Sequence, residues 1–276
     1  MVERISFMLS FSFMQRALIV GLVVSVCASL LGVSLVLKRY AMIGTGLSHV
    51  GYAALVGATA LGFAPLAVSM PVVVGAAFLL LRLNENSKIK GDSAIALISA
   101  SSFAVGVIIV SQTTGLNTHV CNAMFGSILA MTRMDLMLSV GLSIAVIVMF
   151  VLFYKQIFAV TYDETFALAT GTRANAYKSL IAFLTAVTVV LGMRMMGALL
   201  IASLIIFPAI TAMRLCKSFL SVVIVSVIVA VFCFFVGMMI SFELDWPTGA
   251  SVVSVNLVLF IIFSAAQFIK NRVGVA

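Results

Sequence analysis

Residues 35–57, LVLKRYAMIGTGLSHVGYAALVG, contain the position around which the rest of the chain is organised. His49 is the only histidine that lies within otherwise apolar sequence. It follows the basic pair Lys38 and Arg39 and stands between two groups of glycines. An ionisable side chain inside a membrane segment is energetically costly, so such a residue is read as functional by default. We therefore predict a functional role for His49 and interpret the remaining sequence as its scaffold.

The composition indicates a membrane protein with several spans. Hydrophobic residues make up 64% of the chain and charged residues 9%, and the mean hydropathy is +1.30. A soluble domain carries about 25% charged residues. The 276 residues include no long polar segment, so we predict a single transmembrane domain, 1–276. The net charge of +8 is attributed to Lys and Arg in cytoplasmic loops and not to nucleic-acid binding.

Charge-free intervals define the predicted spans, because a helix needs about 20 apolar residues to cross a membrane. Residues 40–81 are too long for one span and divide at the turn Gly62-Phe63-Ala64-Pro65. The segment 121–131 is too short to cross and is predicted to be re-entrant or interfacial. The other predicted spans are 17–37, 93–112, 136–154, 177–193, 195–213, 218–242 and 246–269. This pattern predicts an all-α bundle of nine spans, or of eight if one shorter run does not cross completely.

The distribution of basic residues predicts the orientation. If the long polar interval 161–179 is cytoplasmic, alternation places twelve of the sixteen Lys and Arg residues on the cytoplasmic side. Cytoplasmic loops carry such an excess. With nine spans, the N-terminus lies outside and the C-terminus inside.

Small residues recur every four positions in several spans, which is the spacing that lets helices approach closely in lipid. The same residues can also line a narrow polar path, and we favour packing over lining. The recurring residues are Gly21, Ser25 and Ser29, then Ala53 and Gly57, then Ala198 and Ala202.

Six stretches, in this order, resemble the ABC-3 family, the membrane permease subunits of ABC transporters for zinc, manganese or iron. The resemblance extends from about Arg16 to Phe263. The stretches are GVSLVLKRYAMIGTGLSHVG (32–51), GDSAIALISASSFAVGVIIVS (91–111), FGSILAM (125–131), TYDETFALATG (161–171), MMGALLIASLIIFPAITAMRL (195–215) and LDWPTGASVV (244–253).

The resemblance implies the core of an importer in the bacterial plasma membrane. Two permease chains, identical or paralogous, would form a pathway at their interface. Separate ATPase subunits would bind on the cytoplasmic side, and a metal-binding protein outside would deliver the ion. The cargo would be Zn²⁺ or Mn²⁺, with iron as a further candidate, and no cofactor would be bound permanently. The chain itself has no GxxxxGK[ST] nucleotide-binding motif, so an energised pump needs a separate ATPase.

His49 matches the histidine of the family's SH motif. Neutral imidazole suits Zn²⁺ and similar first-row cations, so His49 is predicted to bind the passing ion transiently. The alternative is a histidine that is hydrogen-bonded to a neighbouring helix. Thr45 occupies the place of the family's Asp, and a hydroxyl is a weaker ligand than a carboxylate for a hard divalent ion.

The polar interval 161–179 is the predicted ATPase-docking element, with a solvated loop as the alternative. Asp163 can cap a short helix centred on residues 164–170. The resemblance adds Glu164, Ala167 and Gly171 as docking residues. Thr165 departs from the family, which often has Glu there.

Two further residues are weaker metal candidates. Asp92 matches a family Asp, although we favour a role as N-cap of the following span. His119 lies in a predicted external loop and could receive an ion from the binding protein, although a loop histidine without a role is favoured.

Three other classes of protein compete with this interpretation. A stand-alone secondary carrier or channel predicts carboxylates well inside the spans, and none occurs there. An intramembrane enzyme needs a nucleophile–base pair or a motif such as HExxH, which is absent. A siderophore or cobalamin permease is the nearest alternative within the ABC class.

Overall fold

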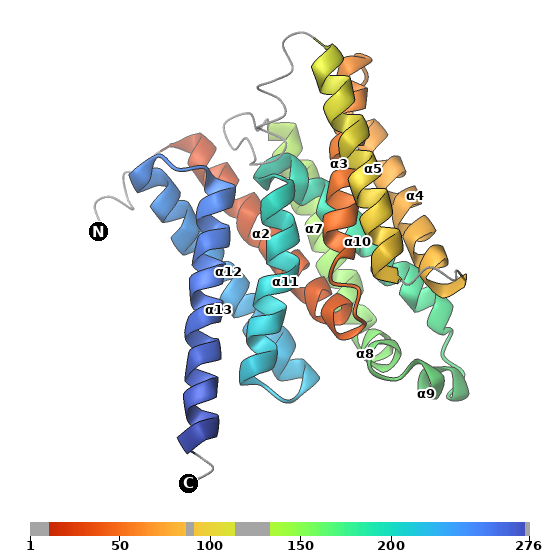
Figure 1. Ribbon diagram of the computed structural model, residues 1–276, viewed down its shortest axis with the longest axis vertical. Coiled ribbons are helices and arrows are strands. Elements are labelled where there is room, and N and C mark those ends of the chain that lie inside the picture. The colour runs from red at the N-terminus through yellow and green to blue at the C-terminus, as the bar shows by residue number, and fades with distance from the viewer. Residues whose placement is uncertain (1–10, 87–90, 114–132, 274–276) are drawn as a thin grey trace.

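The computed structural model describes residues 11–86, 91–113 and 133–273, and the regular structure of these residues is entirely helical (Figure 1). This confirms the predicted all-α transmembrane bundle. The helices are α2 (Ser12–Leu37), α3 (Ile43–Ala60), α4 (Pro65–Asn86), α5 (Gly91–Gln112), α7 (Arg133–Leu152), α8 (Tyr154–Tyr162), α9 (Glu164–Ala169), α10 (Ala174–Met196), α11 (Ala198–Leu215), α12 (Phe219–Leu244) and α13 (Thr248–Val273).

Within the described ranges, 7 helices are long and apolar enough to cross a membrane, and up to 8 if the bent pair α7 and α8 counts as one span. The lower limit of the predicted count, eight, is therefore reached only with that pair. Helix α3 has 18 residues but is not among the seven. Its glycines, its hydroxyl residues and His49 make it less apolar than the other long helices.

The predicted breaks between spans lie close to the observed ones. Gly62 has φ +74 in the turn between α3 and α4, and Gly197 has φ +87 between α10 and α11. Glycine is the usual residue for such positive φ angles. One break was not predicted: the helix that follows residue 133 bends by 69° and continues as α8. The predicted re-entrant segment 121–131 lies outside the described residues.

Helix α2 occupies the centre of the bundle. It contacts α11, α12, α7, α10 and α8, whereas α3 is held between α4 and α5 and also contacts α10 and α11. In Figure 1, α3, α4 and α5 form one group and α2, α11, α12 and α13 another. Helices α10 and α11 contact members of both groups and join them.

Glycines permit the closest helix contacts. A Cβ atom on Gly32 of α2 would collide with the carbonyl oxygen of Ile205 on α11, and one on Gly237 of α12 would collide with the backbone of Val252 on α13. Gly21 of α2 similarly lies against the ring of Phe234. Because lipid provides no hydrophobic force between helices, association depends on this kind of close packing. Of the small residues predicted to pack on α2, Gly21 therefore does so, and Gly32 provides a further close contact.

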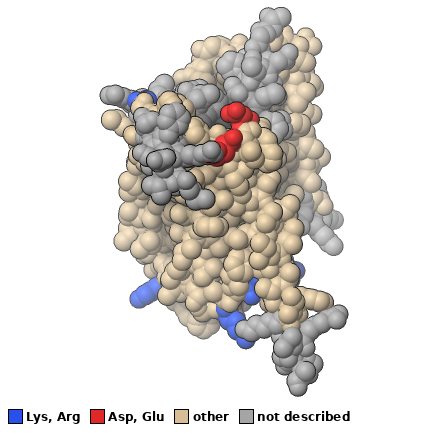
Figure 2. Space-filling view, turned by 90° about the vertical axis from the view of Figure 1, so that its left-hand side faces the viewer, with Lys and Arg blue, Asp and Glu red and all other residues tan. Residues whose placement is uncertain are grey.

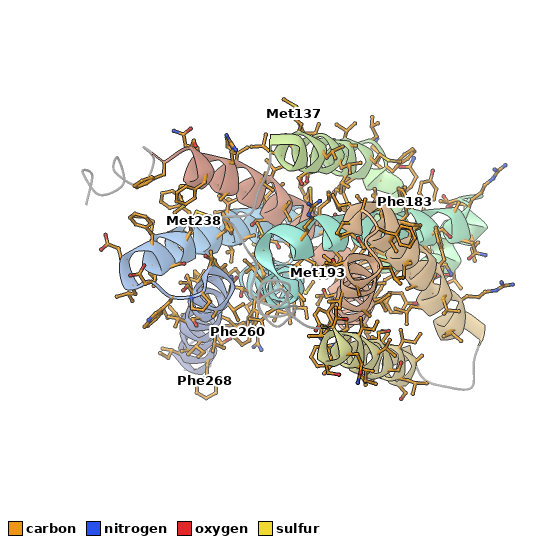
Figure 3. All side chains as sticks on the ribbon, turned by 90° about the horizontal axis from the view of Figure 1, so that it is seen from above. Met137, Phe183, Met193, Met238, Phe260 and Phe268 are labelled. Atoms are coloured by element: carbon orange, nitrogen blue, oxygen red, sulfur yellow. The ribbon has the colours of Figure 1, made fainter. Side chains whose placement is uncertain are left out.

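The outer surface of the bundle is apolar. Seen along the helices in Figure 3, Met193 lies near the middle, whereas Met137 and Phe268 lie at the periphery. Met193 is completely buried, and the two peripheral side chains are exposed. Exposed apolar side chains around a helical bundle are suited to contact with lipid tails.

The two ends of the bundle differ in charge. On the face shown in Figure 2, Lys and Arg side chains lie mainly toward the lower end, and Asp and Glu toward the upper end. Helices α8 and α9 and the C-terminus lie at the lower end in Figure 1.

Replacing Gly32 by Ala tests the contact between α2 and α11. We expect Gly32→Ala to lower the free energy of unfolding by about 1–3 kcal/mol, because the methyl group overpacks a backbone contact. Gly75→Ala is the matched control, since it also lies within a helix and its Cβ would meet nothing within 4 Å. Thermal unfolding of the purified proteins in detergent measures the effect of both substitutions. Equal unfolding temperatures would show that the contact is not tight.

Candidate functional site

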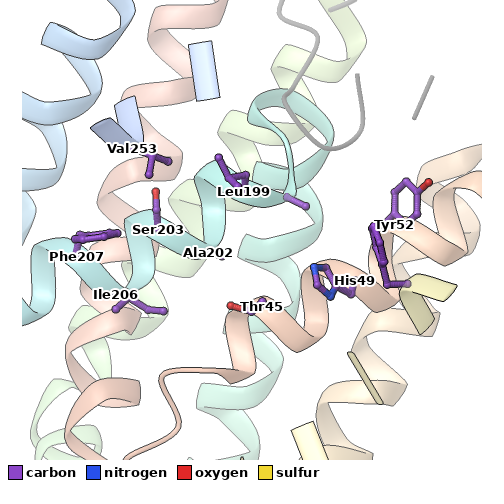
Figure 4. A pocket seen from close by; sticks show the side chains of 11 residues that line it. Thr45, His49, Tyr52, Leu199, Ala202, Ser203, Ile206, Phe207 and Val253 are labelled. Atoms are coloured by element: carbon purple, nitrogen blue, oxygen red, sulfur yellow. The ribbon is translucent and has the colours of Figure 1, made fainter. Parts of the chain in front are cut away.

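A cavity of about 320 Å³ lies between four helices and contains the side chain of His49 (Figure 4). In Figure 4, Thr45 and His49 project from neighbouring turns of α3, and Leu199, Ala202 and Ser203 belong to α11 across the space. Residues four apart on a helix share one face, so α3 presents its polar residues together. The lining residues are Thr45, His49, Tyr52, Phe103, Ala198, Leu199, Ala202, Ser203, Ile206, Phe207 and Val253.

The imidazole of His49 is held by α5. Its Nδ1 lies 2.6 Å from the Oγ of Ser99, and the ring centroid lies 5.1 Å from that of Phe103. When Nδ1–H donates to Ser99, the lone pair of Nε2 is available to a ligand. A hydrogen bond of this kind orients a metal-binding histidine and fixes its tautomer. The sequence left a pathway histidine and a hydrogen-bonded histidine as alternatives, and in the structure His49 both lines the cavity and contacts a neighbouring helix.

The polar groups around His49 are neutral. Thr45 is half-buried in the cavity wall, and the hydroxyl of buried Ser203 donates to the carbonyl oxygen of Leu200 at 2.8 Å. Lone pairs of the Ser203 oxygen remain for a cavity ligand. Among the described residues, no group of three or more His, Cys, Asp or Glu side chains could hold a metal ion. The cavity thus offers imidazole and hydroxyl groups, which can exchange a ligand more readily than a cage of carboxylates.

Several residues around His49 were not singled out from the sequence. Ser99, Tyr52 and Phe103 gave no separate signal, because a serine or an aromatic residue in an apolar helix is ordinary. Ala198 and Ala202, for which packing was favoured, line the cavity. By contrast, Gly57 of α3 faces Ile109 of α5, which is a packing contact. The four-residue spacing identified the helix faces made of small residues but not what these faces contact.

The two weaker metal candidates are not part of the described cavity wall. Helix α5 begins at Gly91, so Asp92 lies in its first turn and not at the capping position that was favoured. Asp92 precedes Ser99 by seven residues, about 10 Å along the helix axis. His119 lies outside the described residues.

The predicted docking element forms a short helix, α9, whose ends are built by two of the predicted residues. Asp163 is the N-cap and accepts a hydrogen bond from the backbone N–H of Phe166 at 3.0 Å. The hydroxyl of Thr165 donates to the same carboxylate at 2.6 Å, and these bonds lower the pKa of Asp163. At the other end, Gly171 has φ +81, and the N–H of Thr172 bonds back into the helix. This arrangement is a Schellman motif, in which glycine is preferred.

The other two predicted docking residues face the permease. Ala167 is completely buried and packs with Val160 and Ala174. The carboxylate of Glu164 accepts from Lys178 of α10 at 2.6 Å and from Lys38, at the end of α2, at 3.1 Å. We call these three side chains the Glu164 bridge. Partial burial acts to raise the pKa of Glu164, but the two lysines outweigh it and leave this pKa below its ordinary value.

The exposed side of α9 carries two large apolar side chains that were not predicted. Phe166 and Leu168 project from it with 63% and 54% of their surface exposed. Tyr162, at the end of α8, is also exposed. The predicted residues thus shape and anchor the element, and its outer surface is provided by their neighbours.

Comparison with known proteins agrees with this architecture. Residues 10–267 match the ABC 3 transport family. The manganese transport system membrane protein MntC of Halalkalibacterium halodurans is 27% identical over 97% of this chain and 91% of its own length. A probable iron transport system membrane protein of Haemophilus influenzae is 31% identical over 92% of this chain and 89% of its own length.

Solved structures give the same result. The structure of PsaBC from Streptococcus pneumoniae in complex with Fab superposes with a TM-score of 0.85 and 28% identity, covering 95% of this chain and 94% of the other. An inward-facing putative metal-chelate type ABC transporter shares the fold, with a TM-score of 0.77 and 14% identity over 92% of this chain and 86% of the other. The fold is thus that of ABC importer permeases, as the resemblance predicted. The chain belongs to the ABC 3 transport family and is a multi-pass membrane permease of the metal transport type.

Proposed function

We propose that this chain is the membrane permease of an ATP-driven importer of divalent transition-metal ions, and that the ion passes His49. Zinc and manganese are the first candidates for the cargo, and iron is a further one. The observation that carries the proposal is the position of His49: its side chain lines a cavity between α3, α5, α11 and α13. The relatives named for manganese and iron transport support this class of cargo.

A second permease chain would complete the pathway. Helices α5 and α13 flank the cavity. Only 28% of the apolar stretch of α5 and 11% of that of α13 are buried within the chain. They lie on the same side of the bundle when it is viewed along the helices (Figure 3). A second copy, or a paralogue, packed on this side would cover the cavity and bring two His49 side chains to one pathway.

Energy would come from a separate ATPase subunit that binds at α9. The exposed Phe166 and Leu168 offer apolar surface for a groove on that subunit, and the chain has no nucleotide-binding motif. The concentration of Lys and Arg at the same end supports a cytoplasmic location for α9 and the C-terminus (Figure 2). We place the protein in the bacterial plasma membrane, with its N-terminus outside if α3 is counted as the ninth span. A metal-binding protein would deliver the ion on the outer side.

The membrane potential already favours entry of a divalent cation by about 4.6 kcal/mol per 100 mV. ATP hydrolysis would therefore serve accumulation beyond that gradient and one-way gating of the pathway.

Uptake of radiolabelled Zn²⁺, Mn²⁺ and Fe²⁺ by cells tests the role of His49. We expect His49→Ala to reduce uptake of the transported ion to background. Ser99→Ala removes the hydrogen bond that orients the ring and should reduce uptake about 10-fold or more. Ser101→Ala is the matched control. Ser101 is exposed on the same helix, and its hydroxyl donates to the carbonyl oxygens of Leu97 and Ile98 of that helix.

Unchanged uptake of all three ions by His49→Ala, at equal expression, would remove His49 from the pathway. Uptake by the purified chain without any ATPase would instead support a secondary carrier or channel.

Thr45→Asp tests how the neutral cavity selects its ion. A carboxylate one turn from His49 adds a hard oxygen ligand, which suits Mn²⁺ better than a hydroxyl does. We expect the ratio of Mn²⁺ to Zn²⁺ uptake to rise severalfold in a competition assay. Thr45→Asn introduces a side chain that is similar in shape to Asp but uncharged, and it should leave this ratio unchanged. A similar rise in both variants would attribute the effect to shape and not to charge.

Phe166→Gln tests the docking surface of α9. Removing the exposed ring should weaken co-purification of the ATPase subunit without changing the unfolding temperature of the permease. Phe63→Gln is the matched control: its ring is 61% exposed, compared with 63% for Phe166, and lies in the turn after α3. Equal retention of the ATPase by both variants would contradict docking at α9.

A further inference from the structure

We infer that the Glu164 bridge links ATPase docking to the pathway helix, with Lys38 and Glu164 as positioning residues. The inference rests on the proposed function, because it assumes that an ATPase binds at α9. It concerns a step that the docking surface and the cavity do not explain by themselves, which is how motion at α9 reaches His49.

The bridge joins three segments that are distant in the sequence. Glu164 is the first residue of α9, Lys178 lies in the second turn of α10, and Lys38 is the C-cap of α2. The two lysines bind different oxygens of the carboxylate, at 2.6 Å and 3.1 Å. A shift of α9 therefore has to move Lys38 or break its ion pair.

The bridge is largely shielded from water on the lysine side. The side chains of Lys178 and Lys38 are 6% and 11% exposed, and that of Glu164 is 40% exposed. Shielded charges interact more strongly than surface ones, and removing one partner of such a pair is costly. The contact is thus strong enough to transmit displacement, unlike an ordinary surface salt bridge.

The connection from Lys38 to the cavity is short and stiff. The backbone N–H groups of Arg39 and Tyr40 bond to the carbonyl oxygens of Val36 and Leu35 at 3.0 and 2.8 Å. These two bonds form a Schellman motif that ends α2. Arg39 has φ +62, a conformation that non-glycine residues adopt only where their surroundings enforce it.

Helix α3 then begins at Ile43, so only four residues separate Lys38 from the pathway helix. Thr45 and His49 follow within its first two turns. Displacement of Lys38 by α9 would therefore pass through one tight turn into the helix that carries Thr45 and His49.

Hydrogen–deuterium exchange of the permease purified with its ATPase tests the link. ATP with vanadate should change exchange in α9 and also in residues 39–46. In Lys38→Met, which leaves the pair between Glu164 and Lys178 in place, we expect the response of α9 to persist. The response of residues 39–46 should decrease roughly 5-fold or more, the lower range of allosteric coupling. Lys38→Arg should restore it.

Two further variants separate coupling from stability. Glu164→Gln should decrease the response of residues 39–46 at least as much as Lys38→Met does, even if it also weakens the fold. Lys217→Met, which removes an exposed lysine from the linker between α11 and α12, should behave like the unmodified protein. If Lys38→Met and Lys217→Met reduced the response equally, the link would be overturned in favour of a general charge effect.

The readout does not depend on the transported metal. A full response of residues 39–46 in Lys38→Met, or no response in the unmodified complex with its ATPase bound, would overturn the link and leave the proposed function standing. Failure of any ATPase to bind would contradict both.

Discussion

The close contact between α2 and α11 is the constraint on which the rest of the structure depends. Gly32 brings the backbone of α2 against the carbonyl group of Ile205, a distance that no residue with a Cβ allows. Within a bilayer, apolar side chains gain nothing by leaving lipid for protein, so van der Waals packing between such surfaces holds the helices together. With α2 and α11 fixed, α3 packs beside α11, and the space between them becomes the cavity.

The chemistry of that cavity reflects its position. The hydrogen bond between His49 and Ser99 and the ring of Phe103 hold the imidazole on one side, and small residues of α11 leave room on the other. Thr45 contributes a hydroxyl where the family resemblance predicts a carboxylate. Imidazole and hydroxyl groups can replace part of an ion's water shell without holding the ion permanently. This combination suits passage of an ion better than storage.

The four residues predicted for docking either shape α9 or connect it to the bundle. Asp163 and Gly171 define its two ends, Ala167 anchors it, and Glu164 binds lysines from α2 and α10. The outward surface carries the large apolar side chains of Phe166 and Leu168. Anchoring contacts and exposed apolar surface thus lie on two faces of a helix of six residues.

The sequence by itself determined the all-helical membrane bundle, most helix boundaries, the cap at Asp163 and His49 as the residue to examine. These follow from local rules: hydropathy, turn glycines, capping and the cost of burying an ionisable group. It could not determine that α7 bends into α8, that Ser99 orients His49, or that α11 lines the cavity. Only the tertiary structure decided that Glu164 binds Lys38, because a separation of 126 positions in the sequence leaves no local signal of their contact.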